Sequence, residues 1–130
     1  MPARHLDLGR QGEDEAARLL EAKGLRILER NLRLGRLELD LVCEDGEYLV
    51  FVEVKTRAEG SLATPADGLT PQKRSRLIRA AQSYLSCRGL WHRPCRFDLV
   101  SVLFRHGAIA HAEHIPDAFS ADMPGTWQPW

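Results

Sequence analysis

Charged side chains interrupt two apolar segments near the middle of this sequence. Asp40 lies in the alternating run 37–43, and Glu53 and Lys55 lie in the run 48–57, which is otherwise rich in β-branched and aromatic residues. Charges that leave water must be paired or bound to a metal. Clustered carboxylate oxygens suit a divalent cation such as Mg²⁺ or Mn²⁺. The two runs therefore indicate a site in which acids hold a metal ion and a lysine lies beside it.

A β-hairpin would bring these side chains together. Both runs have the composition of strands, and Asp45-Gly46 between them is a strong hairpin signal, because a type I′ turn needs positive φ at both central residues. With these residues at the centre of the turn, Asp40 faces Phe51. Glu38 then faces Glu53, so that Asp40 and Glu53 become diagonal neighbours within reach of a shared ligand.

The first of these strands should present two different faces. Side chains alternate along a strand, so the three leucines of 37–43 share one face with Cys43. The other face carries Glu38, Asp40 and Val42. Glu38 and Asp40 would therefore meet Glu53 of the second strand, which brings three carboxylates together. The alternative is a solvated hairpin face whose acids pair with neighbouring basic side chains, and surface ion pairs of that kind contribute little.

Length and composition describe a chain with one core. The 130 residues are 44% hydrophobic and 28% charged, which is typical of a soluble globular protein of one domain. We expect that domain to cover residues 1–115, and residues 116–130, with three prolines and two tryptophans, to form a C-terminal tail. Eighteen basic residues balance eighteen acidic ones, which argues against coating nucleic acid by bulk charge but not against a nuclease whose acids gather at one metal site.

The sequence also indicates a cytoplasmic setting. No apolar run is long enough to span a bilayer, and the first residues lack the hydrophobic core of a signal peptide. The three cysteines are odd in number and widely spaced, which suits neither a disulfide framework nor a zinc-binding pattern. We therefore expect a protein of the reducing cytosol without a membrane partner.

The first helix is expected over residues 6–22 and carries one acid of interest. Glu13 lies at helical spacing on the side of Ala16 and Leu20, which places it on the apolar, inward stripe. An acid at the edge of such a stripe is more often a rim residue than a ligand, so the spacing alone leaves both interpretations open.

Basic residues gather on two further elements. The run 25–34 is typical of an edge strand, and four arginines recur through it and just after it: Arg26, Arg30, Arg33 and Arg36. A second helix is expected from the N-cap Thr70 to about Cys87, with its N-terminal half carrying Lys73, Arg74, Arg76 and Arg79. Both sets could line a path for phosphates. Equally, the first could protect an edge strand from aggregation and the second could be a solvated basic face.

A second hairpin is expected near the end of the domain, after a loop at 58–69 and the second helix. Its strands are 95–104 and 108–115, with the turn around His106. Asp98 in the first of these strands would be an inward polar anchor. His111 and His114 are three residues apart in the second and point to opposite faces, which disfavours a shared metal.

The order of these charged residues resembles the PD-(D/E)xK nuclease superfamily, in which an acid, a hairpin and a Glu-x-Lys segment follow an acidic helix. More narrowly, several segments resemble the small bacterial YraN family (UPF0102): Gly-Glu at 12–13, Arg-Asn at 30–31, Glu-Leu-Asp-Leu at 38–41 and Phe-Val-Glu-Val-Lys-Thr-Arg at 51–57. Members of that family are predicted endonucleases similar to archaeal Holliday junction resolvases. The similarity runs from about residue 8 to residue 102, which is most of the chain.

The resemblance implies an α/β fold of the restriction-endonuclease type, with a central mixed β-sheet flanked by helices. It assigns the catalytic core to three residues, Asp40, Glu53 and Lys55. It also makes Glu13 an accessory acid. Glu38 is a further accessory candidate, but Leu37 precedes it where the family usually has glycine, so the bend expected at that point is relaxed.

The resulting hypothesis is metal-dependent hydrolysis of DNA. Mg²⁺ or Mn²⁺ would be bound by four residues: Asp40, Glu53, Val54 through its carbonyl, and Glu13. The substrate would lie across four basic residues: Arg57, Lys73, Arg76 and Arg36. Branched or structured DNA is favoured because no recognition helix or additional domain is evident, and two copies would be needed to cut two strands, which makes a homodimer plausible.

Two other functions remain open from the sequence. One is a nucleic-acid-binding or adaptor module on the same fold, with weak or no catalysis, whose acids persist for structure. The other is a hydrolase that acts on some other phosphate substrate.

Overall fold

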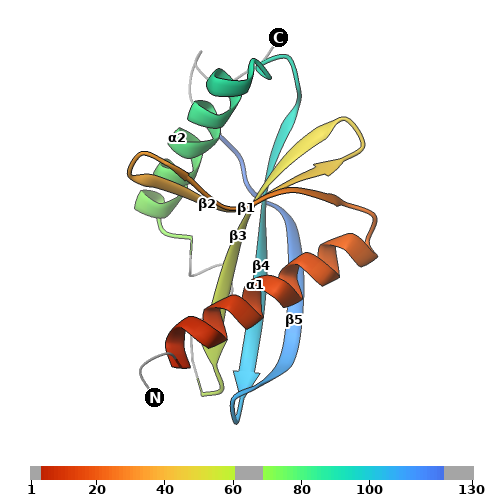
Figure 1. Ribbon diagram of the computed structural model, residues 1–130, viewed down its shortest axis with the longest axis vertical. Helices are drawn as coiled ribbons and strands as arrows, with labels where there is room; N and C mark the ends of the chain where they lie inside the picture. Colours follow the sequence, from red (N-terminus) through yellow and green to blue (C-terminus); the bar gives the residue numbers. More distant parts are fainter. Residues whose placement is uncertain (1–3, 61–68, 122–130) are drawn as a thin grey trace.

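A five-stranded mixed β-sheet with one helix on each face forms the body of the protein (Figure 1). The computed structural model describes residues 4–60 and 69–121, with side chains from residue 8 onward. The elements in chain order are α1 (Arg4–Ala22), β1 (Arg26–Leu34), β2 (Leu37–Asp45), β3 (Tyr48–Ala58), α2 (Pro71–Arg88), β4 (Cys95–Arg105) and β5 (Ala108–Phe119). This α/β architecture confirms the fold class that the resemblance implied.

The sheet runs in the order β1-β2-β3-β4-β5, and within it β3 and β4 are parallel while the other neighbours are antiparallel. Parallel neighbours need a crossover connection, and α2 lies in the segment that supplies it. Alternate residues of β3 enter different cores, because Leu49 and Phe51 pack under α2 whereas Val50 and Val52 pack under α1. Continued alternation puts Glu53 on the α2 side of the sheet.

Local signals define both ends of α2. The side chain of Thr70 accepts a hydrogen bond from the backbone N–H of Lys73 at 3.2 Å, as expected of an N-cap. Gly89 takes the left-handed conformation that ends the helix, and its N–H donates to the carbonyl of Leu85. The predicted start of this helix is confirmed, and its end lies one residue beyond the predicted Cys87.

The hairpin of β2 and β3 forms as predicted, but the predicted register is wrong. Asp45 pairs with Tyr48, so Gly46 and Glu47 are the central residues of the turn. Gly46 has a φ of 60°, and glycine at the first central position is typical of type II′ turns, which do not need positive φ at the second. The same register, continued one step beyond the last pair of the ladder, places Asp40 opposite Glu53. The predicted pairing of Asp40 with Phe51 is therefore corrected.

The strict alternation predicted for β2 is also wrong, because the strand changes faces at Asp40. Leu39 packs in the core under α2, whereas Leu41 and Cys43 pack in the core under α1. Asn31, between the residues of β1 that pair with Leu39 and Leu41, adopts a φ of 52°. Both strands are thus distorted at the same level of the sheet. Position 40 is therefore the point at which the alternation of β2 changes.

The second hairpin confirms the prediction and extends it. His106 and Gly107 form its turn, both at positive φ, as a type I′ turn requires. The last strand was expected to end at Ile115, with a tail from Pro116, whereas β5 continues to Phe119 and Ala121 is buried. Most of the predicted loop, at 61–68, and the rest of the predicted tail, at 122–130, lie outside the described residues.

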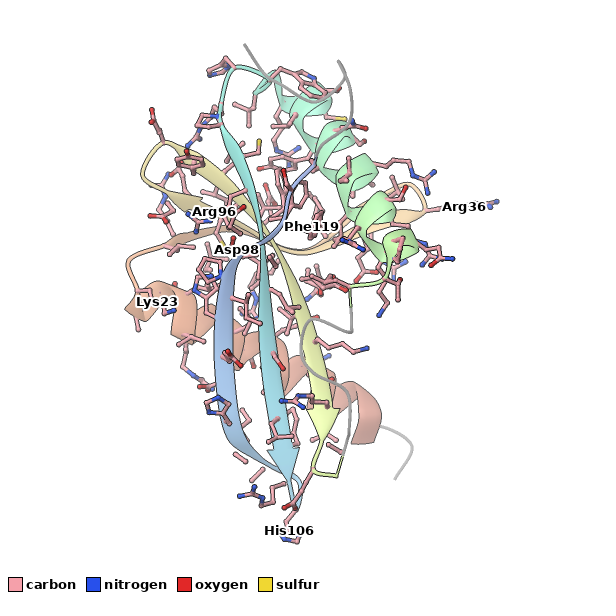
Figure 2. All side chains as sticks on the ribbon, turned by 180° about the vertical axis from the view of Figure 1, so that it is seen from behind. Lys23, Arg36, Arg96, Asp98, His106 and Phe119 are labelled. Atoms are coloured by element: carbon pink, nitrogen blue, oxygen red, sulfur yellow. The ribbon has the colours of Figure 1, made fainter. Side chains whose placement is uncertain are left out.

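Asp98 is the inward polar anchor that the sequence suggested. Its side chain is fully buried, and Arg96 donates to both of its oxygens at 2.9 and 3.0 Å. The backbone N–H of Asp117 donates to Oδ1 at 2.9 Å, and His114 Nε2 lies 2.7 Å from Oδ2. Lys23 Nζ lies 3.0 Å from the other ring nitrogen of His114, so the imidazole proton belongs on Nε2. Figure 2 shows Arg96 and Asp98 side by side in this part of the sheet.

The network around Asp98 keeps that residue ionised. Burial alone raises its pKa, but the hydrogen bonds from Arg96, Asp117 and His114 outweigh burial and hold the pKa below its usual range. His114 is therefore a structural residue of this network, which accords with the sequence argument against a shared metal on His111 and His114.

Within the described residues no helix is long and apolar enough to cross a membrane, and the three cysteines are free thiols.

Candidate active site

The centre of the candidate site is a contact between two carboxyl groups, Asp40 and Glu53. The N–H of Val54 donates to Asp40 Oδ2 at 2.9 Å, so the aspartate side chain takes up a backbone donor just beyond the end of the β2–β3 ladder. This bond orients Asp40 towards β3. Burial, together with the adjacent Asp40 carboxylate and a hydrogen bond between the two side chains, raises the pKa of Glu53 to about 8. Near neutral pH the pair therefore holds a proton in place of a second negative charge.

Two lysines accompany the carboxyl pair. Lys55 lies two residues beyond Glu53 on β3, and Lys73 comes from the first turn of α2. The Lys73 ammonium lowers the pKa of Lys55, with burial adding to the effect. Both cations also act on Glu53 in the direction that favours its ionised form. Two acids and two cations from three elements therefore occupy one electrostatic neighbourhood.

Glu13 belongs to the same neighbourhood, as the resemblance implied. Burial raises its pKa, a hydrogen bond from the Asn31 side chain lowers it, and the nearby Asp40 carboxylate raises it. The acid of α1 thus reaches the sheet where β1 and β2 are distorted. Sequence reasoning gave Asn31 no role, although asparagine is one of the few residues that readily adopts the left-handed conformation seen there.

A groove of about 350 Å³ opens over the carboxyl pair. Its lining comes from β2, β3, the β1–β2 turn and α2: Arg36, Leu37, Glu38, Asp40, Glu53, Lys73, Arg76 and Leu77. Figure 2 shows Arg36 extending from the turn beside the first turns of α2. Most of the sequence candidates therefore come together. Arg57 does not line the groove and lies further along β3.

The three carboxylates expected to surround one ion are not gathered closely. Glu38 lines the groove but is exposed. Among the residues whose side chains are described, no group of three or more His, Cys, Asp and Glu is placed so that it could hold a metal ion. The geometry thus offers a pair of acids, Asp40 and Glu53, with Glu13 nearby as the third.

The position of Glu13 depends on a close approach of α1 to β3 at Gly12. A Cβ at that position would collide with the methyl group of Thr56 and contact the ring of Phe104. Thr56 is β-branched and stiff, so the helix has to move away. We expect Gly12→Ala to destabilise the fold by about 1–3 kcal/mol, as overpacking does, and to displace Glu13. Chemical denaturation of the variant checks the first effect.

Gly9 supplies the matched control for that prediction. It lies in the same helix, and a Cβ there meets nothing within 4 Å. Gly9→Ala is therefore expected to stabilise the protein by about 0.5–1 kcal/mol through helix propensity. Equal effects of the two substitutions would show that the contact with Thr56 does not limit how closely the helix approaches.

The chain is similar to proteins of one family along most of its length. The model of the uncharacterised protein family UPF0102 matches residues 12–102. A UPF0102 protein of Nitratidesulfovibrio vulgaris (strain DP4) is 55% identical over 135 aligned positions, which cover 98% of each chain. A UPF0102 protein of Anaeromyxobacter dehalogenans is 46% identical over 121 positions, covering 92% of this chain and 90% of its own. Another from Lawsonia intracellularis is 43% identical over 129 positions, covering 95% and 97%. The matched region contains both carboxyls, both lysines and Glu13.

Proposed function

This chain belongs to the uncharacterised protein family UPF0102, and from its site we propose that it is a metal-dependent endonuclease that hydrolyses phosphodiester bonds of DNA. The observation that carries the proposal is the contact of Asp40 with Glu53 beside Lys55 and Lys73. Two part-buried acids in contact are unfavourable without a cation between them, and two lysines beside them suit an anionic substrate.

The donor set fits Mg²⁺ or Mn²⁺. Mg²⁺ keeps several of its waters and is usually held by one or two carboxylates together with substrate phosphates, so a pair of acids is sufficient. A divalent ion would replace the proton that Asp40 and Glu53 now share. Asp40, Glu53 and the carbonyl of Val54 would hold the ion, with Glu13 binding one of its waters or a second ion. When bound, the ion supplies charge neutralisation at the phosphate and an acidified water.

The basic residues would act on the substrate directly. Lys55 would donate to the phosphate oxygens that gain charge during hydrolysis or hold the attacking water, and Lys73 would share the same phosphate. Arg57, Arg36 and Arg76 would fix the backbone on either side without reading bases. Branched or structured DNA is the substrate we favour. A cytoplasmic homodimer would allow both strands to be cut.

A binding module without catalysis is the second candidate. It is favoured by one observation, the absence among the described side chains of three acids close enough to enclose an ion. In that case Asp40 would serve to hold β3 through the Val54 N–H, and the basic residues would bind nucleic acid without cutting it. The two candidates differ in what they do to intact DNA.

Cleavage of supercoiled plasmid and of a four-way junction tests the proposal. We expect nicking that requires Mn²⁺ or Mg²⁺ and stops on chelation, and that disappears in Asp40→Ala and Glu53→Gln. Glu113→Gln is the matched control, since it makes the same change at an exposed site on β5. Activity that survives in Asp40→Ala would indicate a contaminating nuclease. DNA binding without cleavage in the unaltered protein would favour the binding module.

A further inference from the structure

A second, more distant groove continues from the site along α2. It is lined by Arg36, Leu37, Arg76 and Arg79, and it shares the first three of these with the groove over the carboxyl pair. None of the described residues that line it is acidic. On α2, Arg79 lies three residues and therefore about 4.5 Å beyond Arg76 along the axis. The positive charge consequently spreads away from the site and does not converge on one point.

These three arginines differ from most others in the protein. Arg26, Arg88, Arg93, Arg96 and Arg105 each form an ion pair with an acid at 2.7–3.1 Å. Within residues 8–60 and 69–121, Arg36, Arg76 and Arg79 have no ion pair or hydrogen bond with another side chain. Cations held near one another without internal counterions are unfavourable, so they favour an external anion.

The form of the groove indicates what kind of anion that is. Guanidinium groups present a planar fork of N–H donors that matches phosphate oxygens. Three forks spread along a groove suit a chain of phosphates better than a single one. Leu37, the other described lining residue, offers no hydrogen-bond donor or acceptor from its side chain, so the groove lacks the mixed donors and acceptors by which base edges are distinguished.

We propose that this arginine groove (Arg36, Arg76 and Arg79) binds the sugar-phosphate backbone of the nucleic-acid strand beyond the cleaved bond, independently of its sequence. The proposal rests on the proposed function for its substrate class. It adds Arg79 to the residues that contact the substrate. It also separates these positioning contacts from Lys55 and Lys73, which face the reacting phosphate.

Salt dependence of DNA binding tests the groove without relying on cleavage. Affinity for a short duplex of fixed sequence is measured in Ca²⁺ at several salt concentrations. Each lost phosphate contact should reduce the slope of log K against log salt by about 0.9. We expect that reduction in Arg36→Ala, Arg76→Ala and Arg79→Ala, with Arg79→Lys retaining the original slope because the charge persists. A second duplex of different sequence should bind equally.

Arg18→Ala is the matched control, because Arg18 is an exposed arginine of α1 that pairs with Glu15. Its slope should equal that of the unaltered protein, and melting temperatures establish that each variant is folded. Unchanged slopes in all three groove variants overturn the inference, as does equal competition by polyglutamate at the same charge concentration. Reduced slopes in a protein that never cuts DNA support the groove and count against the endonuclease. DNA cleavage with unchanged slopes supports the endonuclease and counts against the groove.

Discussion

Lys55→Met is expected to lower the rate of DNA cleavage by about 10²–10³-fold, the loss typical of removing one donor to a developing oxyanion. The ammonium lies beside Glu53 and Lys73, where it can reach a phosphate held at the carboxyl pair. Methionine keeps most of the apolar stem and removes only the charge. Removing a cation from beside the acids should leave divalent-ion affinity the same or higher.

Calorimetric titration with Mn²⁺ beside single-turnover cleavage separates these two effects. Asp40→Asn should lose both ion binding and cleavage, because it removes a ligand. Lys55→Arg should recover part of the rate, since charge persists while its position changes. Full activity in Lys55→Met, with ion binding intact, would remove this lysine from the mechanism and leave Lys73 as the cation at the phosphate.

Asp98→Asn is expected to destabilise the protein by about 3–5 kcal/mol at pH 7, the cost of breaking a buried ion pair by removing one partner. Asp98 accepts from Arg96, Asp117 and His114, and its side chain has no exposed surface. The amide that replaces it has one oxygen and no charge. Arg96 contacts two acids in the unaltered protein, and in the variant only Asp45 still pairs with it as a charged group. Denaturant unfolding measures the loss.

The pH dependence of that loss has a definite sign. The pKa of Asp98 is lower in the folded protein than the unfolded value of about 3.9, so its contribution is complete above that value and lost as the pH falls below it. The difference between Asp98→Asn and the unaltered protein should therefore shrink below about pH 4. Asp117→Asn is the matched control: it is exposed, its φ of 53° suits asparagine, and its N–H contact to Asp98 remains. A comparable loss in that variant would contradict the assignment to the buried carboxylate.

The elements and most of the site could be read from the sequence because their signals are local. Apolar periodicity, the Thr70 cap and the glycine-containing turns lie within a few residues of what they specify. The order Asp40, turn, Glu53 was enough to bring the two acids together even with the wrong register. Asp45-Gly46 misplaced the turn by one residue because glycine serves in more than one turn type.

What the sequence could not supply depends on distant parts of the chain. Leu39 and Leu41 are alike in a pattern of alternation, yet they enter opposite cores at the level where β1 has the positive φ of Asn31. The partners of Asp98 include His114 and Asp117 from the next strand, and no spacing rule pairs them. The sequence left Arg79 as either a phosphate contact or part of a solvated basic face, and only its neighbours in space place it beside Arg36 and Arg76.

The parallel pairing of β3 with β4 has a consequence for how the molecule folds. Asp40 and Glu53 are joined through a two-residue turn, so their loop closes quickly, whereas Lys73 arrives only with the crossover helix. Early hairpin formation brings the two acids together with Lys55 beside them, before Lys73 is in place. The contact between the two acids thus works against the first folding step, and the later docking of α2 with Lys73 relieves that frustration.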